Sequence, residues 1–154
     1  SIVEPNLQTE RIEVAVHHSQ ELPQLVGDSE QLVQVFRNLL ENSINAISEW
    51  SERNEPGQIT IVTDLKTGRD SENGHDWLIV ECKDDGPGIP KDLQKFIFEP
   101  FVTSRDTGTG VRTRGTGLGL AIVTKIIERH RGNITVSSIL GRGTEFTVSL
   151  PVVK

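Results

Sequence analysis

Apolar residues follow two kinds of pattern in the first part of this chain. Ile12, Val14 and Val16 alternate with polar neighbours, which predicts a strand over residues 11–16. Over residues 28–50 the apolar positions recur every three or four residues, which predicts one long helix with a broad inward face. Asp28, followed three residues later by Gln31, is typical of a helix start. The pattern therefore predicts a strand followed by a long helix.

The rest of the chain predicts more strands and a second long helix. Strand patterns cover residues 58–63, 77–83, 133–139 and 144–150, with a hairpin turn at 141–143. The second helix follows residue 118 and ends in a basic turn before Gly132. Residues 64–76 are polar and predict a surface loop, and a short helical stretch runs toward Phe96. These elements predict an α/β fold, a two-layer α/β sandwich with one mixed sheet and helices packed on one face.

Composition narrows the kind of protein that this sequence encodes. With 154 residues it fits a single domain, and 34% hydrophobic with 25% charged residues indicates a globular chain. The net charge of -6 disfavours nucleic acid as a partner, because phosphate contacts need clustered Lys and Arg. No apolar run approaches the roughly 20 residues of a membrane span, and no signal peptide is visible. We therefore expect a cytoplasmic domain with no direct membrane contact, in which Cys82, the single cysteine, is a buried small hydrophobe.

Three asparagines share one stripe of the first predicted helix. At about 100° per residue, Asn38, Asn42 and Asn45 fall within roughly 60° of one another, away from the apolar arc. Solvated helix faces usually carry Glu, Lys and Arg, and Asn is a poorer helix former by about half a kcal/mol. An amide can offer oxygen to Mg²⁺ and N–H to a phosphate. The stripe is therefore a candidate ligand site, with an ordinary solvated face as the alternative.

Two glycine-containing blocks are further candidates for ligand binding. Asp84 ends a predicted strand and precedes Gly86 and Gly88, so a carboxylate acceptor stands beside backbone that can approach a flat ring closely. The second block leads directly into the second predicted helix, whose N-terminal N–H groups can bind phosphates. It consists of Gly115, Thr116, Gly117, Leu118, Gly119 and Leu120. Each block alone is a weak signal, because acidic turns and glycine-rich loops are common.

Together, and in this order, the blocks resemble the catalytic, ATP-binding domain of sensor histidine kinases. These kinase domains belong to a wider superfamily that also includes DNA gyrase, the mismatch-repair ATPase and heat-shock chaperones. The resemblance covers residues 10–152 through five blocks, at 38–47, 84–90, 98–101, 115–122 and 143–146. Within the family, the N-A-I and F-E-P-F-V-T-S segments resemble nitrogen-regulation-type kinases. The resemblance implies a Bergerat-type ATP-binding fold, with residues 1–154 forming one catalytic domain of a larger kinase.

The resemblance also implies roles for individual residues, with ATP and Mg²⁺ as cofactors. Asn42 would coordinate Mg²⁺, and Asn38 would lie near the phosphates. Asp84 would bind the adenine amino group, supported through water by the Thr144 hydroxyl. The adenine slot would be lined by Gly86, Gly88 and Ile89, and the phosphates bound by residues 115–120. Residues 98–114 would form a lid over the nucleotide.

Two features of the sequence qualify this resemblance. Many such kinases carry Lys or Arg where this chain has Asn45, so the phosphate charge would be met by Arg105, Arg112 or Arg114. A phosphoacceptor motif, a His followed by an acidic residue and then a Pro, does not occur in this sequence. We therefore expect the acceptor histidine on a separate dimerisation domain, and a response regulator receiver domain as the onward partner.

The sequence leaves two other functions open. An ATP-driven conformational ATPase of the same superfamily would carry Glu in place of Asn38, because a neutral amide cannot act as a general base. A partner-binding module that has lost its nucleotide is disfavoured by Asn42, Asp84 and the glycine-rich blocks. The sequence therefore favours a histidine kinase that donates the γ-phosphoryl group of ATP.

Overall fold

A mixed five-stranded sheet is the centre of the fold. The computed structural model describes residues 12–18, 25, 27–50, 56–68, 74–99 and 119–152. The strand order is β1-β2-β3-β5-β4, where β1 pairs with β2 in parallel and the other pairs are antiparallel. The strands are β1 (Ile12–His18), β2 (Gly57–Lys66), β3 (Asp76–Asp84), β4 (Asn133–Ile139) and β5 (Gly143–Val152).

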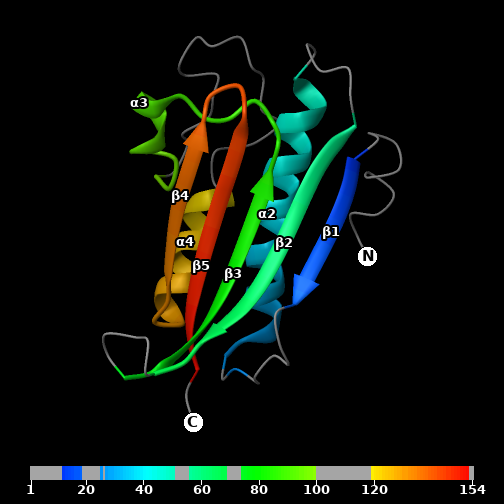
Figure 1. Cartoon of the computed structure of the whole chain (residues 1–154). Helices are drawn as coiled ribbons and strands as arrows, with labels where there is room; N and C mark the ends of the chain where they lie inside the picture. The colour runs from blue at the N-terminus through cyan, green and yellow to red at the C-terminus, as the bar shows by residue number, and fades with distance from the viewer. Residues whose placement is uncertain are drawn as a thin grey trace.

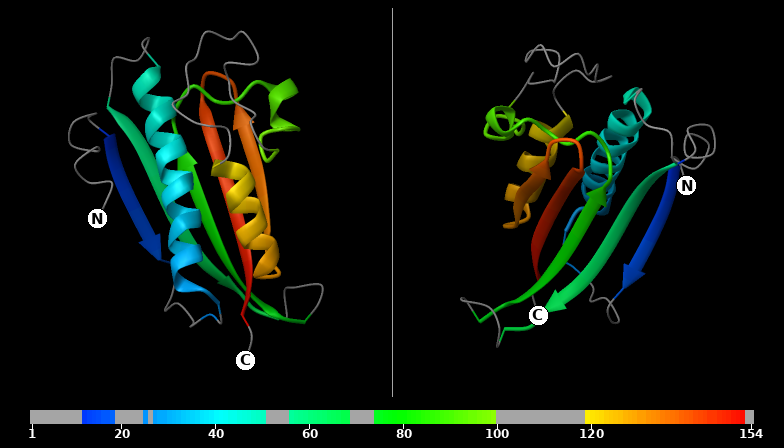
Figure 2. Two further views of the ribbon diagram at one scale, coloured as in Figure 1. Left: turned by 180° about the vertical axis from the view of Figure 1, so that it is seen from behind. Right: turned by 45° about the horizontal axis from the view of Figure 1, so that its top comes forward.

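The long helices cover one face of this sheet. Figure 1 shows α2 (Ser29–Glu49) and α4 (Gly119–Arg129) behind the strands, and the reverse view in Figure 2 places both in front. The short helix α3 (Lys91–Gln94) lies beside β4. The predicted two-layer α/β sandwich, with helices on one face of a mixed sheet, is therefore confirmed. No helix in the described part of the chain is long and apolar enough to cross a membrane.

Helix α2 forms as its sequence predicts. The Asp28 side chain accepts a hydrogen bond from the Gln31 backbone N–H at 3.1 Å, which caps the first turn. The inward positions Val35, Leu39 and Ile47 are buried against the sheet. They join a core whose sheet side includes Ile59, Val80, Cys82, Phe146 and Val148. Cys82 is a free, buried thiol, as expected of a small hydrophobe in the core.

One predicted boundary was wrong. Residues 64–66 belong to β2, where Leu65 pairs with Leu78 and Lys66 with Trp77, and Asp76 opens β3. Asp64 and Lys66 are exposed, whereas the preceding residue of β2, Thr63, faces the other side of the strand and is buried. These polar residues therefore mark the uncovered face of a strand, and the connection is shorter than the predicted loop.

The C-terminal end of α4 is closed by a backbone motif. Gly132 N–H donates to the Ile127 carbonyl at 2.9 Å, and Arg131 N–H donates to Glu128 at 3.0 Å. Arg131, not the following glycine, has the left-handed backbone with φ of 59°. A side chain at Gly132 would collide with the Ser149 carbonyl of β5, so this glycine permits close packing on the sheet.

His130 joins the ends of the two long helices. Its Nε2 accepts a hydrogen bond from the Asp28 backbone N–H at 3.0 Å, so Nε2 carries a lone pair. Its Nδ1 lies 2.8 Å from the Ile126 carbonyl and is therefore the protonated nitrogen. The neutral ring connects the C-terminus of α4 to the N-cap of α2.

We expect His130→Ala to lower the free energy of unfolding by about 1–2 kcal/mol, because both hydrogen bonds are lost and Asp28 N–H loses its partner. Urea denaturation measures this change. His17→Ala, on the exposed edge strand β1, is the matched control and should change stability by less than about 0.5 kcal/mol. Equal effects of the two substitutions would contradict the bridging role.

Candidate functional site

Asp84 is a buried carboxylate at the end of β3. Its side chain is 5% exposed. Oδ2 accepts a hydrogen bond from the Ser43 hydroxyl on α2 at 2.7 Å, and Oδ1 accepts one from Gly86 N–H at 2.9 Å. The Thr144 backbone N–H is a third donor to this carboxylate. A carboxylate offers about four acceptor positions, so these bonds fix its orientation and still leave acceptor capacity for a ligand.

Burial and hydrogen bonding act on this carboxylate in opposite directions. Burial raises the pKa of Asp84 above its ordinary value, and the neighbouring Asp85 adds to the increase. The Ser43 hydroxyl and the backbone N–H groups of Gly86 and Thr144 lower it in part. Burial, together with the charge of Asp84, also raises the pKa of the Cys82 thiol to about 12, which leaves that thiol unreactive.

Thr144 lies beside Asp84 on the covered face of the sheet. The two residues are paired across β3 and β5, and Thr144 is 7% exposed. Directly paired side chains on one face of a sheet approach closely. The structure therefore brings together the two residues that the sequence predicted for the adenine amino group.

The turn after Asp84 is held close to neighbouring backbone. Gly88 has φ of 77°, and a side chain there would collide with the Ile139 carbonyl. The buried Pro87 accepts a hydrogen bond from Gly141 N–H at 2.6 Å. Ile89 N–H donates to the Ser138 hydroxyl at 2.8 Å. The hairpin between β4 and β5 thus supports Gly86, Gly88 and Ile89, the residues predicted to line the adenine slot.

The asparagines of α2 include one, Asn38, that reaches the start of α4. Asn38, Asn42 and Asn45 are all partly buried. The Asn38 amide donates to the Gly119 carbonyl at 3.4 Å, so its oxygen is left as an acceptor. Gly119 and Leu120 form the first turn of α4, where backbone N–H groups have no partner within the helix. Asn38 is therefore adjacent to an anion-attracting helix terminus.

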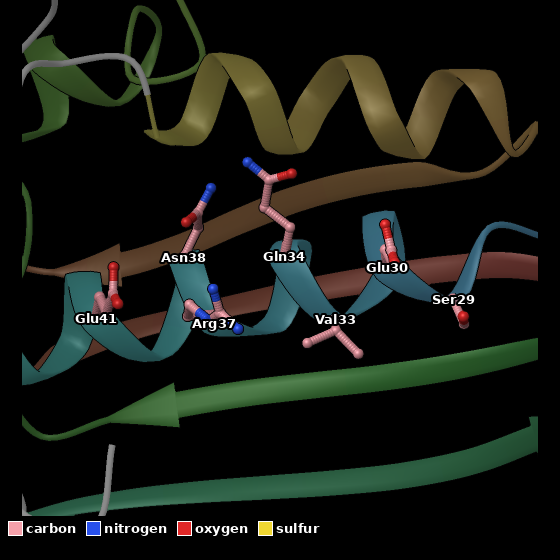
Figure 3. A pocket seen from close by; sticks show the side chains of 7 residues that line it. All are labelled: Ser29, Glu30, Val33, Gln34, Arg37, Asn38 and Glu41. Carbon is pink, nitrogen blue, oxygen red and sulfur yellow. The ribbon is translucent and has the colours of Figure 1, made fainter. Parts of the chain in front are cut away.

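A groove of about 570 Å³ runs along α2. Figure 3 shows the side chains that line it. Its described lining consists of Ser29, Glu30, Val33, Gln34, Arg37, Asn38 and Glu41. Asn38 and Gln34 point toward α4 in this view. The groove reaches Asn38 but not Asp84, and its charged lining does not suit a flat base. We therefore place the candidate base-binding end at Asp84 and not in this groove.

Several predicted residues lie outside the part of the chain that the structure describes. These are Gly115, Thr116, Gly117 and Leu118 of the phosphate loop, the lid segment 100–114, and the three lid arginines. The last described residues before this stretch include Phe98, whose ring packs edge-on against Phe146 at 6.2 Å between centroids. The predictions for this segment remain predictions.

The structure adds site residues that the sequence patterns did not single out for function. Ser43 lies at a buried, inward position of α2, and its hydroxyl is the closest hydrogen-bond partner of Asp84, at 2.7 Å. Ser138 and Gln94 bind the turn and the hairpin that carry the predicted residues. A polar residue at an inward position, as at Ser43, was the available signal. The partners of Ser138 depend on strand register and left no signal in the sequence.

Comparisons with known proteins agree with this geometry. Residues 27–154 match the family model described as histidine kinase-, DNA gyrase B-, and HSP90-like ATPase. The chain is 46% identical over 136 residues to the sensory histidine kinase/phosphatase NtrB of Rhodobacter capsulatus, covering 85% of this chain and 34% of that protein. It is 36% identical over 153 residues to the sensor histidine kinase ZraS of Salmonella typhi, covering 99% and 29% respectively.

Solved structures show the same fold. The catalytic domain of histidine kinase ThkA, in a nucleotide-free form, has a TM-score of 0.73 and 29% identity, covering 97% of this chain and 86% of that chain. Full-length ShkA in complex with AMPPNP has a TM-score of 0.76 and 26% identity, covering 99% of this chain and 28% of that chain.

The chain belongs to the family of histidine kinase-, DNA gyrase B-, and HSP90-like ATPases. NtrB, ZraS and ThkA are all named as histidine kinases, which confirms the class that the sequence resembles. The chain spans 34% of the length of NtrB and 29% of the length of ZraS.

We expect Asp84→Asn to make the nucleotide-free chain more stable at neutral pH, by about 1 kcal/mol, because a buried charge is removed while the Ser43 hydroxyl can reverse its hydrogen bond. The folded-state pKa of Asp84 is raised, so the folded chain binds this proton more tightly than the unfolded chain. The stability that protonation of Asp84 contributes is therefore fully present below the ordinary pKa of an aspartate. It is lost as pH rises through the raised pKa of the folded chain. Urea denaturation across this interval measures it.

The stability difference between Asp84→Asn and the parent chain should therefore grow with pH across that interval. Asp92→Asn, an exposed carboxylate on α3, is the control and should leave the pH dependence unchanged. An Asp84→Asn chain that is less stable at every pH would show that the carboxylate strengthens the fold.

Proposed function

We propose that this chain is the catalytic domain of a sensor histidine kinase. It binds Mg-ATP and donates the γ-phosphoryl group to a histidine on a separate dimerisation and phosphoacceptor domain. The phosphoryl group then passes to the receiver domain of a response regulator. The observation that carries this proposal is the buried, oriented carboxylate of Asp84, paired with Thr144 and joined through α2 to Asn38 and the start of α4.

The base-binding end suits an adenine amino group. Asp84 is 5% exposed and accepts hydrogen bonds from Ser43, Gly86 and the Thr144 backbone, which leaves an acceptor position that a ligand N–H can occupy. The turn at Gly86 and Gly88, with Ile89 beyond it, forms the side of the slot. In this reading, Asp84 accepts from the amino group and Thr144 supports the same contact.

The proposed phosphate-binding end of the site is separated from Asp84 by a short stretch of α2. Asn38 is five positions before Ser43 on α2, which is roughly 7.5 Å along the helix axis. The first turn of α4 supplies backbone N–H groups that have no partner within the helix, and the positive end of the helix dipole. We assign the phosphates to Asn38, Asn45 and residues 115–120, of which Gly119 and Leu120 are the described members.

The chemistry of the α2 side chains suits a hard cation. Asn42 presents a neutral amide on the partly buried side of α2 between Ser43 and Asn38, and amide oxygens are accepted ligands of Mg²⁺, which also takes oxygens from phosphates. We propose Asn42 as the protein ligand. The ion, when bound, neutralises charge on the phosphates. The residues of this chain hold and orient the nucleotide, which is most of what phosphoryl transfer requires of a protein.

Transfer to another domain is favoured over hydrolysis by the identity of Asn38. A neutral amide at this position cannot remove a proton from water. An ATP-driven conformational ATPase needs a general base there, such as a Glu carboxylate. Because the chain covers about a third of NtrB and of ZraS (34% and 29%), there is room in such proteins for a phosphoacceptor domain. We propose a cytoplasmic location for this domain, whatever anchors its parent.

Asp84→Asn should reduce the affinity for Mg-ATP by about 10- to 100-fold, because one acceptor for the adenine amino group is replaced or reversed, at roughly 1.5–3 kcal/mol. Isothermal titration calorimetry measures the affinity. Asp85→Asn is the neighbouring control, since Asp85 Oδ1 instead accepts from Gln58 N–H at 2.8 Å. Unchanged affinity in a natively melting Asp84→Asn chain would remove the adenine assignment.

The isolated chain should bind Mg-ATP but hydrolyse it very slowly, because general-base assistance worth about 10²–10⁴-fold is missing. Phosphate release over hours measures turnover, and Asn38→Glu should raise it. Glu41 is exposed and lies about 100° around α2 from Asn42, the proposed metal ligand, so Glu41→Gln should have no effect. Rapid hydrolysis that is abolished by Glu41→Gln would favour the conformational ATPase instead.

A further inference from the structure

Ser138 is the meeting point of three hydrogen bonds beside the candidate adenine slot. Its hydroxyl donates to the Gly143 carbonyl at 2.9 Å and accepts from Ile89 N–H at 2.8 Å. The same oxygen lies 2.9 Å from the Thr144 hydroxyl. The partners come from the turn after β3 and from the start of β5, so this one side chain connects two segments that carry predicted adenine contacts.

The number of protons in this cluster sets the direction of each hydrogen bond. A hydroxyl has one proton, and a carbonyl can only accept, so the Ser138 proton is engaged with Gly143. An amide N–H can only donate, so Ile89 occupies one Ser138 lone pair. In the contact between Ser138 and Thr144 either hydroxyl could be the donor by geometry alone. Because the Ser138 proton is engaged with Gly143, the donor role is assigned to Thr144, whose oxygen then keeps only lone pairs for a ligand.

Gln94 keeps this arrangement in place. Its side-chain amide donates to the Ile89 carbonyl at 2.9 Å and to the Ser138 carbonyl at 3.1 Å. The backbone of the turn and the backbone of β4 are therefore held on either side of the Ser138 hydroxyl. A hydroxyl in such a fixed frame has little freedom to change partners.

Asp84 and Thr144 then present two acceptors side by side. The Asp84 oxygens receive hydrogen bonds from Ser43 and Gly86, and the residue pairs directly with Thr144 across the sheet. An exocyclic amino group has two N–H donors and matches two acceptors. A keto oxygen has no donor and would meet two sets of lone pairs.

We propose that Ser138 is a specificity-determining positioning residue, which fixes Thr144 as a hydrogen-bond acceptor and thereby makes the site select 6-amino purine nucleotides over 6-keto ones. The inference rests on the proposed function, because it assumes that the base lies at Asp84. Ser138 acts through Thr144 and does not itself touch the nucleotide. Sites built to match donors to acceptors reject the mismatched ligand strongly, because buried polar groups are otherwise left unpaired.

Replacing Ser138 with alanine releases the Thr144 proton. The Thr144 hydroxyl is then free to rotate and to donate to a keto oxygen. The test compares ATP with inosine triphosphate, which carries a keto oxygen at C6 and a proton on N1. Calorimetry on the full 154-residue chain with Mg²⁺ gives both affinities, and their ratio is the readout.

We expect Ser138→Ala to lower the ratio of ATP affinity to inosine triphosphate affinity by about 5- to 30-fold, as one hydrogen bond changes direction. Ser137→Ala is the matched control, because Ser137 is the preceding serine of β4 and is exposed on the other face. In a Thr144→Val background, Ser138→Ala should leave the ratio unchanged, since the hydroxyl through which it acts is absent.

Two results would overturn the proposal. If Ser138→Ala weakens both nucleotides equally, the residue has only a structural role. If the ratio changes as much in the Thr144→Val background, Ser138 does not act through Thr144. Should Ser138→Ala fail to fold, Thr144→Val alone decides: it must weaken ATP and spare inosine triphosphate, and an equal loss contradicts the inference. A parent chain that binds neither nucleotide would instead overturn the proposed function.

Discussion

The hydrogen bond between Ser43 and Asp84 connects the helical layer to the sheet at the point where the site is built. Its donor lies on α2 and its acceptor at the end of β3, and both side chains are almost fully removed from solvent. Because α2 is rigid, fixing Ser43 also fixes Asn42 and Asn38, the residues assigned to the metal and the phosphates. In the function that we propose, the order of these residues along one helix would set the order of the parts of a bound nucleotide.

This arrangement keeps a charge where the fold alone would not favour one. Burial raises the pKa of Asp84, and the hydrogen bonds from Ser43 and Gly86 only partly offset that effect. A carboxylate in this position is therefore better explained by a ligand than by stability. The same reasoning extends to Ser138 and Thr144, whose hydrogen bonds leave acceptors rather than donors at the ligand side.

Much of the fold could be predicted from sequence because its periodicities are strong. The long apolar pattern with Asp28 at its start predicts α2. The family resemblance assigns Thr144 and Asp84 to one contact, and the strand register pairs these two residues. The limits have physical causes. The sequence predicts a loop at Asp64 and Lys66, although both belong to β2. Charged residues occur on an uncovered sheet face as well as in loops, so polarity alone does not distinguish the two. The roles of Ser43 and Ser138 depend on contacts between residues far apart in the chain, which periodicity cannot report.

We propose that Asp84 fixes the position of the base as the acceptor for the amino group of adenine. A crystal structure of this chain with Mg²⁺ and a non-hydrolysable ATP analogue tests it most directly. We expect the adenine amino nitrogen at about 2.8–3.2 Å from an Asp84 carboxylate oxygen, with the Ser43 hydrogen bond to that carboxylate intact. A base bound elsewhere, such as in the groove along Glu30 and Arg37, with Asp84 still enclosed by protein alone, would contradict it.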